Sequence, residues 1–513
     1  MKTITHLFLA GITLLGIALN VNANNIQVAN CGLINQNTSA GANNPANHTF
    51  IRFDLSWENS WRVSSAPANW DAAWVFVKYR VQPSEVWQHA YLSTSGHVSG
   101  SGTAASVQVG LVNEGAPHNS VSNPAVGAFV YRANSGSGSF GATNIQLKWD
   151  YVLQGINDDD VIDIQVYAVE MVYVTEGDFY LGDEGGGIGM LSEGGTASSP
   201  FQVTSEGAIS ISNSTGSLWG VNGTYANTNT TSNSSGYWYS TGGTGTLSAA
   251  FPKGHKGFYC MKYETSQQQY VDYLNALNSS QQSARAYTGG ANRSGISLSG
   301  GTYITSAPFV ANNHMSWADG ICFADWTGLR PMTEFEFEKA SRGASNPFPD
   351  EYAWGNTTIV QSQGITNPGA DDETASNTAA NTTYGPHASV PGPIRVGSHA
   401  GTGTSRVDAG ASYYGMMELS GNLWERCVTM GRPEGRAFTG LHGNGEITAL
   451  GSADVTNWPG DNAVGSGNRG GAWNTTATLL RVSDRSQARY TYTGRSGSHG
   501  FRAVRTVPST PAN

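Results

Sequence analysis

The segment from Asn474 to His499 carries the side chains best suited to molecular recognition. Thr, Ser, Tyr, Leu and Gly fill it, between Arg481, Ser483, Arg485 and Arg495. Tyr offers rigid amphipathic contact area at a low entropy cost, while Ser, Thr and Gly adapt their hydrogen bonding, as in antibody paratopes. We expect the ligand-contacting residues to be Thr475, Thr476, Leu479, Leu480, Ser486, Tyr490, Tyr492, Ser496 and Ser498.

Metal-binding and redox side chains form a weaker pattern. The chain has four cysteines: Cys31, Cys260, Cys322 and Cys427. None lies in a C-x-x-C or Cys/His spacing, which argues against a structural zinc site. In an oxidising compartment they allow three complete pairings, and the sequence does not choose among them. Three histidines are isolated in the sequence and are expected to be loop or core residues: His314, His442 and His499.

A succession of motifs marks the larger part of the chain. In order, the motifs are MVYVTEGDFYLG (171–182), YCMKYET (259–265), LRPMTEFEFEKA (329–340), GNLWE (421–425), RGGAW (469–473) and GFRAVR (500–505). Together they resemble the formylglycine-generating enzyme family, the sulfatase-modifying factors, whose domain is a variant of the C-type lectin fold. The resemblance implies an α+β domain of this kind over residues 168–507.

The resemblance also bears on catalysis. Active members of the family carry two cysteines five residues apart, the first at the second position after the aromatic residue of the R-G-G-[SA]-[WF] turn. The matching positions here are Thr475 and Leu480. Neither side chain forms a thiolate or binds copper, and Cys427 lies in a different motif. We therefore expect a binding protein rather than an enzyme, and no copper.

A calcium site is implied by the same resemblance. In the family, calcium is held beside the G-N-x-W-E motif by a side chain three residues before its Gly, by two backbone carbonyls and by the closing Glu. Carried over, the ligands are Glu418, the carbonyls of Gly421 and Leu423, and Glu425. Glu418 stands where the family often has an amide, and its charge suits a hard cation bound by oxygen. The alternative is that Glu425 caps backbone amides without metal. A second site would use the region around Asn381 and Thr382.

The Asn474–His499 segment is also similar to the variable proteins of diversity-generating retroelements. These proteins use the same lectin-like domain and randomise asparagine codons just before a terminal G-F-R motif. Every expected contact residue, and Gly497, can be encoded by a codon that differs from an asparagine codon only in its first two bases. Such residues are also common in ordinary loops, so a diversified and a fixed binding face both stay open.

Short helices are expected to position these motifs. The first should begin after Thr265 or Ser266 as N-cap and place Tyr270, Leu274 and Leu277 on one face, because these residues are four and three positions apart. The helix would then bury this face against the rest of the domain.

Two further helices have clear start signals. Residues Trp317–Trp326 are expected to form a helix that is capped by Ser316 and stopped by Gly328. Thr333 and Glu336 have the spacing of a capping box, which predicts a third short helix directly after them.

Residues 24–167 have a different character. Short apolar runs separated by Gly, Ser, Asn and Pro, several with apolar/polar alternation, predict an all-β, sandwich-like domain of unknown family. Its tryptophans are expected to be mostly core or strand-pair aromatics rather than a sugar-stacking platform. The boundary is expected near Ala168. Residues 184–246, rich in Gly, Ser, Asn and Thr, are expected to be a polar insertion of long loops.

The N-terminus and the charge limit where the chain works. Lys2, the apolar Leu7–Leu19 stretch and the small residues up to Ala23 are typical of a secretory signal peptide over residues 1–23. We expect a secreted, periplasmic or cell-surface protein with no transmembrane segment in the mature chain, ending in a short tail at 508–513. A formal charge of -10 without a basic run argues against nucleic acid as a partner.

These observations together predict an exported, non-catalytic protein that binds a protein or glycan ligand, for example on another cell surface, through its C-terminal loops. Two alternatives stay open. One is a formylglycine-generating type of oxidase, or a related enzyme, whose chemistry has moved elsewhere in the chain. The other is a scaffold subunit of a surface or secretion assembly.

Overall fold

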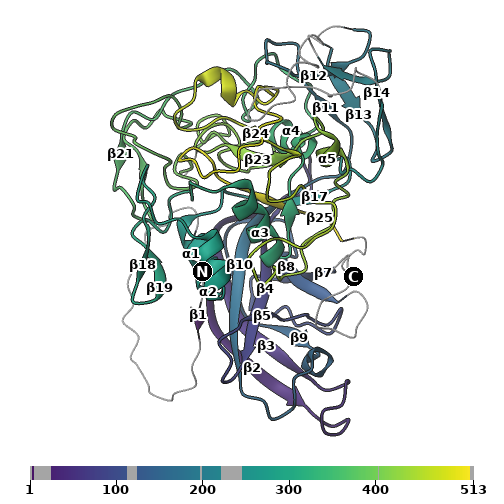
Figure 1. Cartoon of the computed structure of the whole chain (residues 1–513), viewed down its shortest axis with the longest axis vertical. Coiled ribbons are helices and arrows are strands. Elements are labelled where there is room, and N and C mark those ends of the chain that lie inside the picture. The colour runs from purple at the N-terminus through teal and green to yellow at the C-terminus, as the bar shows by residue number, and fades with distance from the viewer. Residues whose placement is uncertain are drawn as a thin grey trace.

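One large sheet runs through both halves of the chain (Figure 1). The computed structural model describes residues 25–111, 124–196, 199–220, 245–401 and 404–508, and the backbone of residues 3–4. In spatial order the main strands of the sheet are β20 (Arg330–Pro331), β25 (Ala503–Thr506), β17 (Phe258–Met261), β10 (Ile162–Val174), β4 (Asp71–Val81), β8 (Ala125–Arg132) and β7 (Ala105–Leu111). Two short strands pair with β10 and β4: β1 (Thr3–Ile4) and β5 (Gln88–His89). The rest of the expected signal peptide and residues 509–513 of the tail lie outside the described ranges.

A second sheet packs against the N-terminal part of the first. Its strands are β2 (Gln27–Asn37), β3 (His48–Arg62), β9 (Gly136–Trp149) and β6 (Ser101–Gly102). Alternate residues of β3, such as Phe53 and Leu55, meet Val75 and Val77 of β4 in one buried cluster. Because side chains alternate between the two faces of a strand, this period-two pattern is what directs them into a common core.

The strand β10 joins the two halves of the chain. Its residues Ile162–Val172 pair with β4, and its last residues, Met171–Val174, pair with β17. The expected boundary near Ala168 therefore falls inside a continuous strand. The N-terminal strands and the C-terminal region therefore share one sheet. Strand β10 links them, because it pairs with β4 from the N-terminal part and with β17 from the C-terminal part.

The three expected helices are present with their expected caps. They are α1 (Gln267–Asn275), α3 (Trp317–Trp326) and α4 (Glu334–Arg342), and their N-caps are Ser266, Ser316 and Thr333, each in a capping box. Tyr270, Leu274 and Leu277 are buried as the spacing predicts. Four shorter elements were not expected from the sequence: α2 (Ser279–Arg285), α5 (Pro433–Arg436) and the 3-10 helices η1 (Tyr151–Gln154) and η3 (Ala477–Leu480).

The prediction of long loops over residues 184–246 is wrong for its described part. Short strands occur there, in two small sheets with their neighbours: β11 (Phe179–Leu181) with β13 (Phe201–Val203), and β12 (Leu191–Glu193), β15 (Leu218–Gly220), β14 (Ile209–Ile211) and β16 (Gly245–Leu247). Leu191, Ile211 and Leu218 bury one face of these strands. Each strand is only three residues long, so the surrounding Gly, Ser and Asn hid the alternation. Residues 197–198 and 221–244 lie outside the described ranges.

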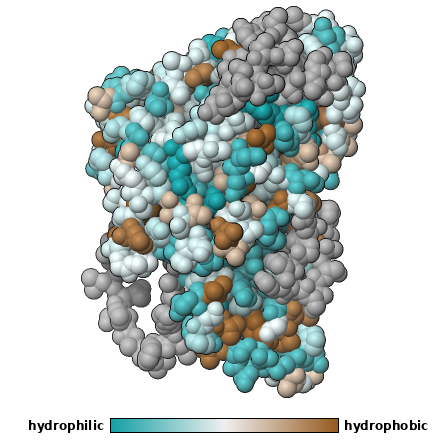
Figure 2. All heavy atoms as spheres, in the orientation of Figure 1, coloured by the Kyte–Doolittle hydropathy of each residue, from teal (hydrophilic) through white to brown (hydrophobic). Residues whose placement is uncertain are grey.

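The C-terminal region is built from long connections around small two-stranded sheets. These are β18 (Ile296–Ser299) with β19 (Thr302–Thr305), β21 (Ile365–Thr366) with β22 (Thr374–Ala375), and β23 (Glu425–Val428) with β24 (Ser466–Arg469). The described chain is thus mostly β-structure and connections with few helices, and none of its helices is long and apolar enough to cross a membrane. On the face drawn in Figure 2, hydrophobic residues gather at the lower end, over β2, β3 and β9, whereas the upper part is mostly hydrophilic.

Candidate functional site

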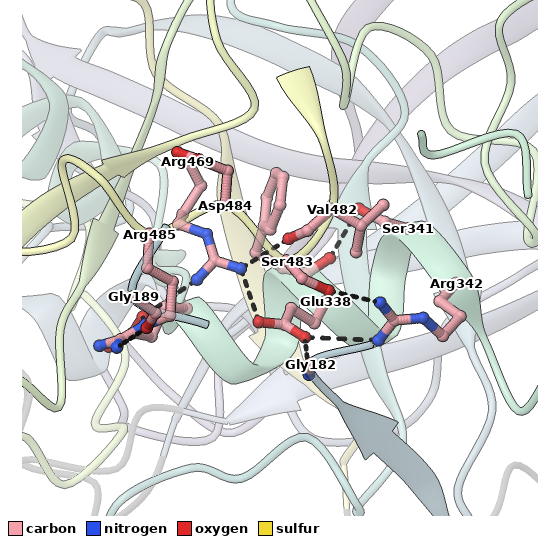
Figure 3. A network of polar contacts seen from close by, with 12 residues as sticks. Gly182, Gly189, Glu338, Ser341, Arg342, Arg469, Val482, Ser483, Asp484 and Arg485 are labelled. Atoms are coloured by element: carbon pink, nitrogen blue, oxygen red, sulfur yellow. Dashed lines mark hydrogen bonds and ion pairs between the residues drawn. The ribbon is translucent and has the colours of Figure 1, made fainter. Parts of the chain in front are cut away.

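A buried ion-pair network fixes the C-terminal loops to helix α4 (Figure 3). Arg469, at the end of β24, places Nη1 3.0 Å from Glu334 Oε2 and Nη2 2.6 Å from Glu338 Oε1. The same Nη2 donates to the carbonyl of Val482 at 2.7 Å. Both carboxylates come from one face of α4, so the helix holds the RGGAW turn and the following segment in one place.

The network extends along the recognition segment. Arg485 Nε lies 2.6 Å from Glu334 Oε2, and Arg342 Nη2 donates to Ser483 Oγ at 2.9 Å. Burial acts to raise the pKa of Glu334, but the guanidinium groups of Arg485 and Arg469 outweigh it and lower that pKa. These arginines therefore brace the fold by charge-assisted hydrogen bonds.

The two positions where the family has cysteines do not resemble a catalytic pair. Thr475 Oγ1 accepts from the Ala472 amide at 2.8 Å and lies 2.9 Å from the Ala472 carbonyl, so its hydroxyl closes a turn. Leu480 is fully buried and packs in a cluster with Tyr352 and Trp354. The prediction that the Leu480 side chain contacts ligand is wrong in this structure, because the 3-10 helix η3 turns it into the core.

The other expected contact residues differ in how far they reach the surface. Thr476 is exposed, and Leu479, Ser486 and Ser496 are half-buried. Ser486 Oγ donates to Asp484 Oδ1 at 2.6 Å, which ties it to its own turn. Ser498 is only 9% exposed, and its hydroxyl lies 3.1 Å from that of Ser496. Of this group, Thr476 and Leu479 are the residues most open to a ligand.

Tyr490 and Tyr492 form a half-buried aromatic group with His499. Their ring centroids lie 5.9 Å apart, and each lies within 6.2 Å of the His499 ring. Arg426, on β23 beneath them, donates from Nη2 to the Tyr492 carbonyl at 2.9 Å. Burial and then Arg426 hold the pKa of His499 well below its ordinary value. A neutral imidazole and two phenol rings thus present an aromatic, hydrogen-bonding surface.

The residues expected to bind calcium lie close to a third carboxylate that sequence reasoning missed. Glu264 accepts from the Leu423 amide at 2.8 Å and from Asn422 Nδ2 at 2.6 Å. Glu425 Oε1 lies 2.7 Å from Arg502 Nε, and Glu418 Oε1 accepts from the Gly397 amide at 2.7 Å. Gly421 has a φ of 104°, which favours glycine at this turn of the motif. Glu264 is the second-last residue of the YCMKYET motif, and its place in that motif is the sequence signal that could have identified it.

Two oxygen atoms in this cluster fit a cation. Glu418 Oε2 and Glu425 Oε2 are buried without a hydrogen-bond partner. Burial raises the pKa of Glu418 to about 7 and also raises the pKa of Glu425 and Glu264. No group of three or more His, Cys, Asp or Glu with metal-holding geometry occurs in the described ranges. Any metal here would therefore rely on the two free carboxylate oxygens and on backbone carbonyls. At the second expected calcium site, Asn381 Oδ1 accepts from the Val360 amide and Thr382 Oγ1 donates to the Ser420 carbonyl.

The cysteines and histidines are structural. All four cysteines are buried and unpaired with one another, and burial raises the pKa of Cys260 to about 12. His314 stacks on Tyr287 with ring centroids 4.1 Å apart, and His442 Nε2 accepts from the Thr506 amide at 3.0 Å. These residues fill the core and connections, as expected for isolated histidines.

Comparison with known families agrees with the motifs. The sulfatase-modifying factor enzyme 1-like domain matches residues 225–507, more than half of the chain. The chain therefore belongs to this family. The matched range of this chain contains the GNLWE, RGGAW and GFRAVR motifs and the ion pairs of Arg469.

Similar individual proteins fall into two groups. A formylglycine-generating enzyme of Thermomonospora curvata is 31% identical over 129 residues, which are 25% of this chain and 36% of that enzyme, about a third of its length. Two solved structures are similar over larger parts of the chain. Treponema denticola variable protein 1 matches with a TM-score of 0.32 and 14% identity over 66% of this chain and 96% of that one. A Major Tropism Determinant I1 variant matches with a TM-score of 0.22 and 16% identity over 63% and 81%.

Proposed function

We propose that this chain is an exported, non-catalytic member of the sulfatase-modifying factor family that binds a protein or glycan ligand through its C-terminal loops. The observation that carries the proposal is the state of the two positions where active members have cysteines. Thr475 closes a turn with its hydroxyl, and Leu480 is fully buried in the core. With these residues the segment cannot supply a thiolate pair, and what it offers outward is a set of hydroxyl, phenol and aliphatic groups.

The composition and placement of the outward side chains support recognition. Tyr490 and Tyr492 are half-buried and rest on Arg426 and His499, so they are held in place before any ligand arrives. Preorganised aromatic side chains lose little conformational entropy on binding and serve as anchors in protein interfaces. Thr476, the N-cap of η3, adds an exposed hydroxyl, and Leu479 on η3 adds a half-buried aliphatic side chain.

The binding test uses the full mature chain and arrays of defined ligands. A glycan array and an array of extracellular proteins should give a signal that the double variant Tyr490→Ala/Tyr492→Ala loses, while its melting temperature stays within a few degrees of the parent. A matched control is Tyr180→Ala, which removes a half-buried aromatic ring from β11. A signal that survives loss of both tyrosines would reject this face as the binding surface.

We also propose that calcium stabilises the loops around the GNLWE motif. Glu418 and Glu425 would hold it through the two buried oxygens that lack a partner, with carbonyls of Gly421 and Leu423. The ion would supply positive charge to a buried carboxylate cluster that Arg502 and Arg395 partly offset. Addition of calcium to chelator-treated protein should raise the melting temperature, and Glu418→Gln should remove most of that rise. An equal rise in the variant would reject these ligands.

A further inference from the structure

Beside Tyr490 lies a group of arginines that lacks the carboxylates found elsewhere in the molecule. Arg489 is 5% exposed, yet it makes no ion pair or side-chain hydrogen bond with any residue that the structure describes. Its Nε atom is buried and unpartnered, and so is the Nε of Arg432. Buried polar groups in proteins almost always have a partner, so two unpartnered guanidinium nitrogens at one place point to something that completes the site.

Geometry places these arginines together. The stem of Arg489 packs on Gly431, where a Cβ would lie 2.6 Å from Arg489 Cγ. Arg432 follows directly in the chain and is half-buried, and its carbonyl accepts from the Arg436 amide at 3.0 Å in the short helix α5. Segments 431–436 and 489–490 therefore bring the half-buried side chains of Arg432 and Arg436 close to the largely buried side chain of Arg489, next to Tyr490.

The local charge is unbalanced. Burial, followed by the nearby charges of Arg432, Arg485 and Arg436, lowers the pKa of Arg489 to about 10, and the carboxylate of Glu434 opposes this shift. Arg485 is already neutralised by Glu334. Among the described residues, the acid that acts on Arg489 is thus the exposed Glu434, in a protein whose overall charge is -10. Arg436 donates from Nη1 to the Met430 carbonyl at 2.9 Å. Like charges held together at low solvent exposure are unfavourable unless an anion joins them.

We propose that Arg432 and Arg489, with Arg436 beside them, bind a carboxylate group of an acidic protein ligand. The planar guanidinium fork matches a carboxylate in a bidentate arrangement, and two forks can share one such group. A protein is favoured over a glycan as its source because the neighbouring Tyr490, Tyr492 and Ser486 have the composition of surfaces that recognise proteins. This inference rests on the proposed function, since it names the chemistry of a ligand bound at the same surface.

The test is a titration of the full chain with a hexaglutamate peptide, with hexaglutamine as the neutral peptide. The parent should bind hexaglutamate with an affinity that falls as salt is raised, and it should not bind hexaglutamine. The double variant Arg432→Gln/Arg489→Gln should weaken binding at least tenfold. Gly431→Ala, which keeps every charge but displaces the Arg489 stem, should also weaken it. Arg52→Gln is the matched control, because Arg52 is half-buried, has an unpartnered Nε and lies on β3.

A second measurement separates binding from a structural role. Without ligand and at low salt, Arg489→Gln should melt at the same temperature as the parent or higher, because it removes a buried charge that lacks a counterion. A lower melting temperature together with unchanged peptide affinity would show that Arg489 only supports the fold and would overturn the proposal. Binding of a sulfated oligosaccharide but not of hexaglutamate would overturn the assignment to a protein ligand.

The outcome is distinguishable from failure of the proposed function. The peptide is a defined probe and does not depend on finding the natural ligand. Arrays without a Tyr490-dependent signal would count against the recognition face, whereas a flat hexaglutamate titration would count against the arginine site alone.

Discussion

Two sets of buried arginines come from the same part of the chain and differ in one respect. Arg469 and Arg485 both reach the carboxylate of Glu334, at 3.0 and 2.6 Å. Arg426 and Arg489 have no carboxylate within ion-pair distance in the described ranges, and burial lowers the pKa of each to about 10. The paired set holds the RGGAW turn to α4, and the unpaired set lies beneath and beside Tyr490. Charge is thus balanced at the RGGAW turn and left unbalanced beneath and beside Tyr490.

The difference separates two kinds of buried charge. A paired arginine with all its partners inside the fold contributes to the shape of the native state, and removing one partner leaves an uncompensated charge. An unpaired arginine costs stability in the free protein and regains it only when an anion binds. Stability and binding measurements should therefore move together for the first set and in opposite directions for the second.

The largest effect is expected from Glu334→Gln. This change leaves Arg469 and Arg485 without the negative charge that they share and replaces one of the two acceptor oxygens by an amide NH2 group. Breaking a buried pair typically lowers the free energy of unfolding by about 3–5 kcal/mol. Urea denaturation followed by tryptophan fluorescence measures it.

The control for that change is the exposed pair of Arg80 and Glu85. Their atoms lie 2.7 Å apart, but the Glu85 side chain is 87% exposed. Glu85→Gln should change the free energy of unfolding by less than about 1 kcal/mol. Similar losses in the two variants would mean that the Glu334 network is no more important than a surface pair.

The second prediction compares two neighbouring leucines. Leu480→Ala should lower the free energy of unfolding by about 2–5 kcal/mol, because the side chain is fully buried against Tyr352 and Trp354. Leu479→Ala removes the same atoms from a half-buried position and should cost about 1 kcal/mol or less. Equal decreases in the free energy of unfolding would show that both leucines lie in the core, so that Leu479 would not be available to a ligand.

A third prediction uses a buried cation between the sheet and α3. Lys78 Nζ lies 3.0 Å from His89 Nδ1 and 2.8 Å from the Trp326 carbonyl, and burial lowers the pKa of Lys78 to about 7 despite the attraction of Glu446 and Asp325. Between pH 7 and 10.5 the unfolded chain holds a proton that the folded chain lacks. The contribution of Lys78 to the free energy of unfolding therefore rises with pH in this window, by at most about 1.4 kcal/mol per pH unit.

The measurement is the difference in pH dependence between the parent and Lys78→Met. The raised pKa of Asp325 gives a slope of the opposite sign in both proteins, so only the difference isolates Lys78. Parallel stability curves between pH 7 and 10 would show that Lys78 stays protonated in the fold.

Local sequence patterns predicted the three capped helices. They could not predict contacts between segments that are far apart in the sequence. The caps Ser266, Ser316 and Thr333 act on amides three residues away, so the sequence pattern contains the whole interaction. The burial of Leu480 depends on Trp354, more than a hundred residues earlier in the chain, and no local pattern reports it. The expected calcium ligands came from a motif, whereas the hydrogen bond between Glu264 and the Leu423 amide, far apart in the sequence, could not be predicted from it.

The smallest change in the free energy of unfolding is expected for substitutions at Thr476. Comparison with Leu480 distinguishes a position that tolerates variation from one that does not. Thr476 is exposed, and its hydroxyl contacts only that of Thr478, at 3.0 Å, among the described residues. Replacement by Ser, Asn or Tyr should change the free energy of unfolding by about 0.5 kcal/mol or less. The same three residues at Leu480 would place polar atoms in the core and should prevent stable folding.

This contrast decides how far diversification can reach in the segment. If the codons for residues 475–498 are varied in nature, variants recovered from related strains should differ at Thr476, Tyr490 and Tyr492 and keep Leu480 apolar. Sequencing the gene and its flanks from several strains tests this directly. Polar residues at position 480 in folded variants would mean that η3 can turn this side chain outward. Position 480 would then belong to the ligand-binding surface and not to the core.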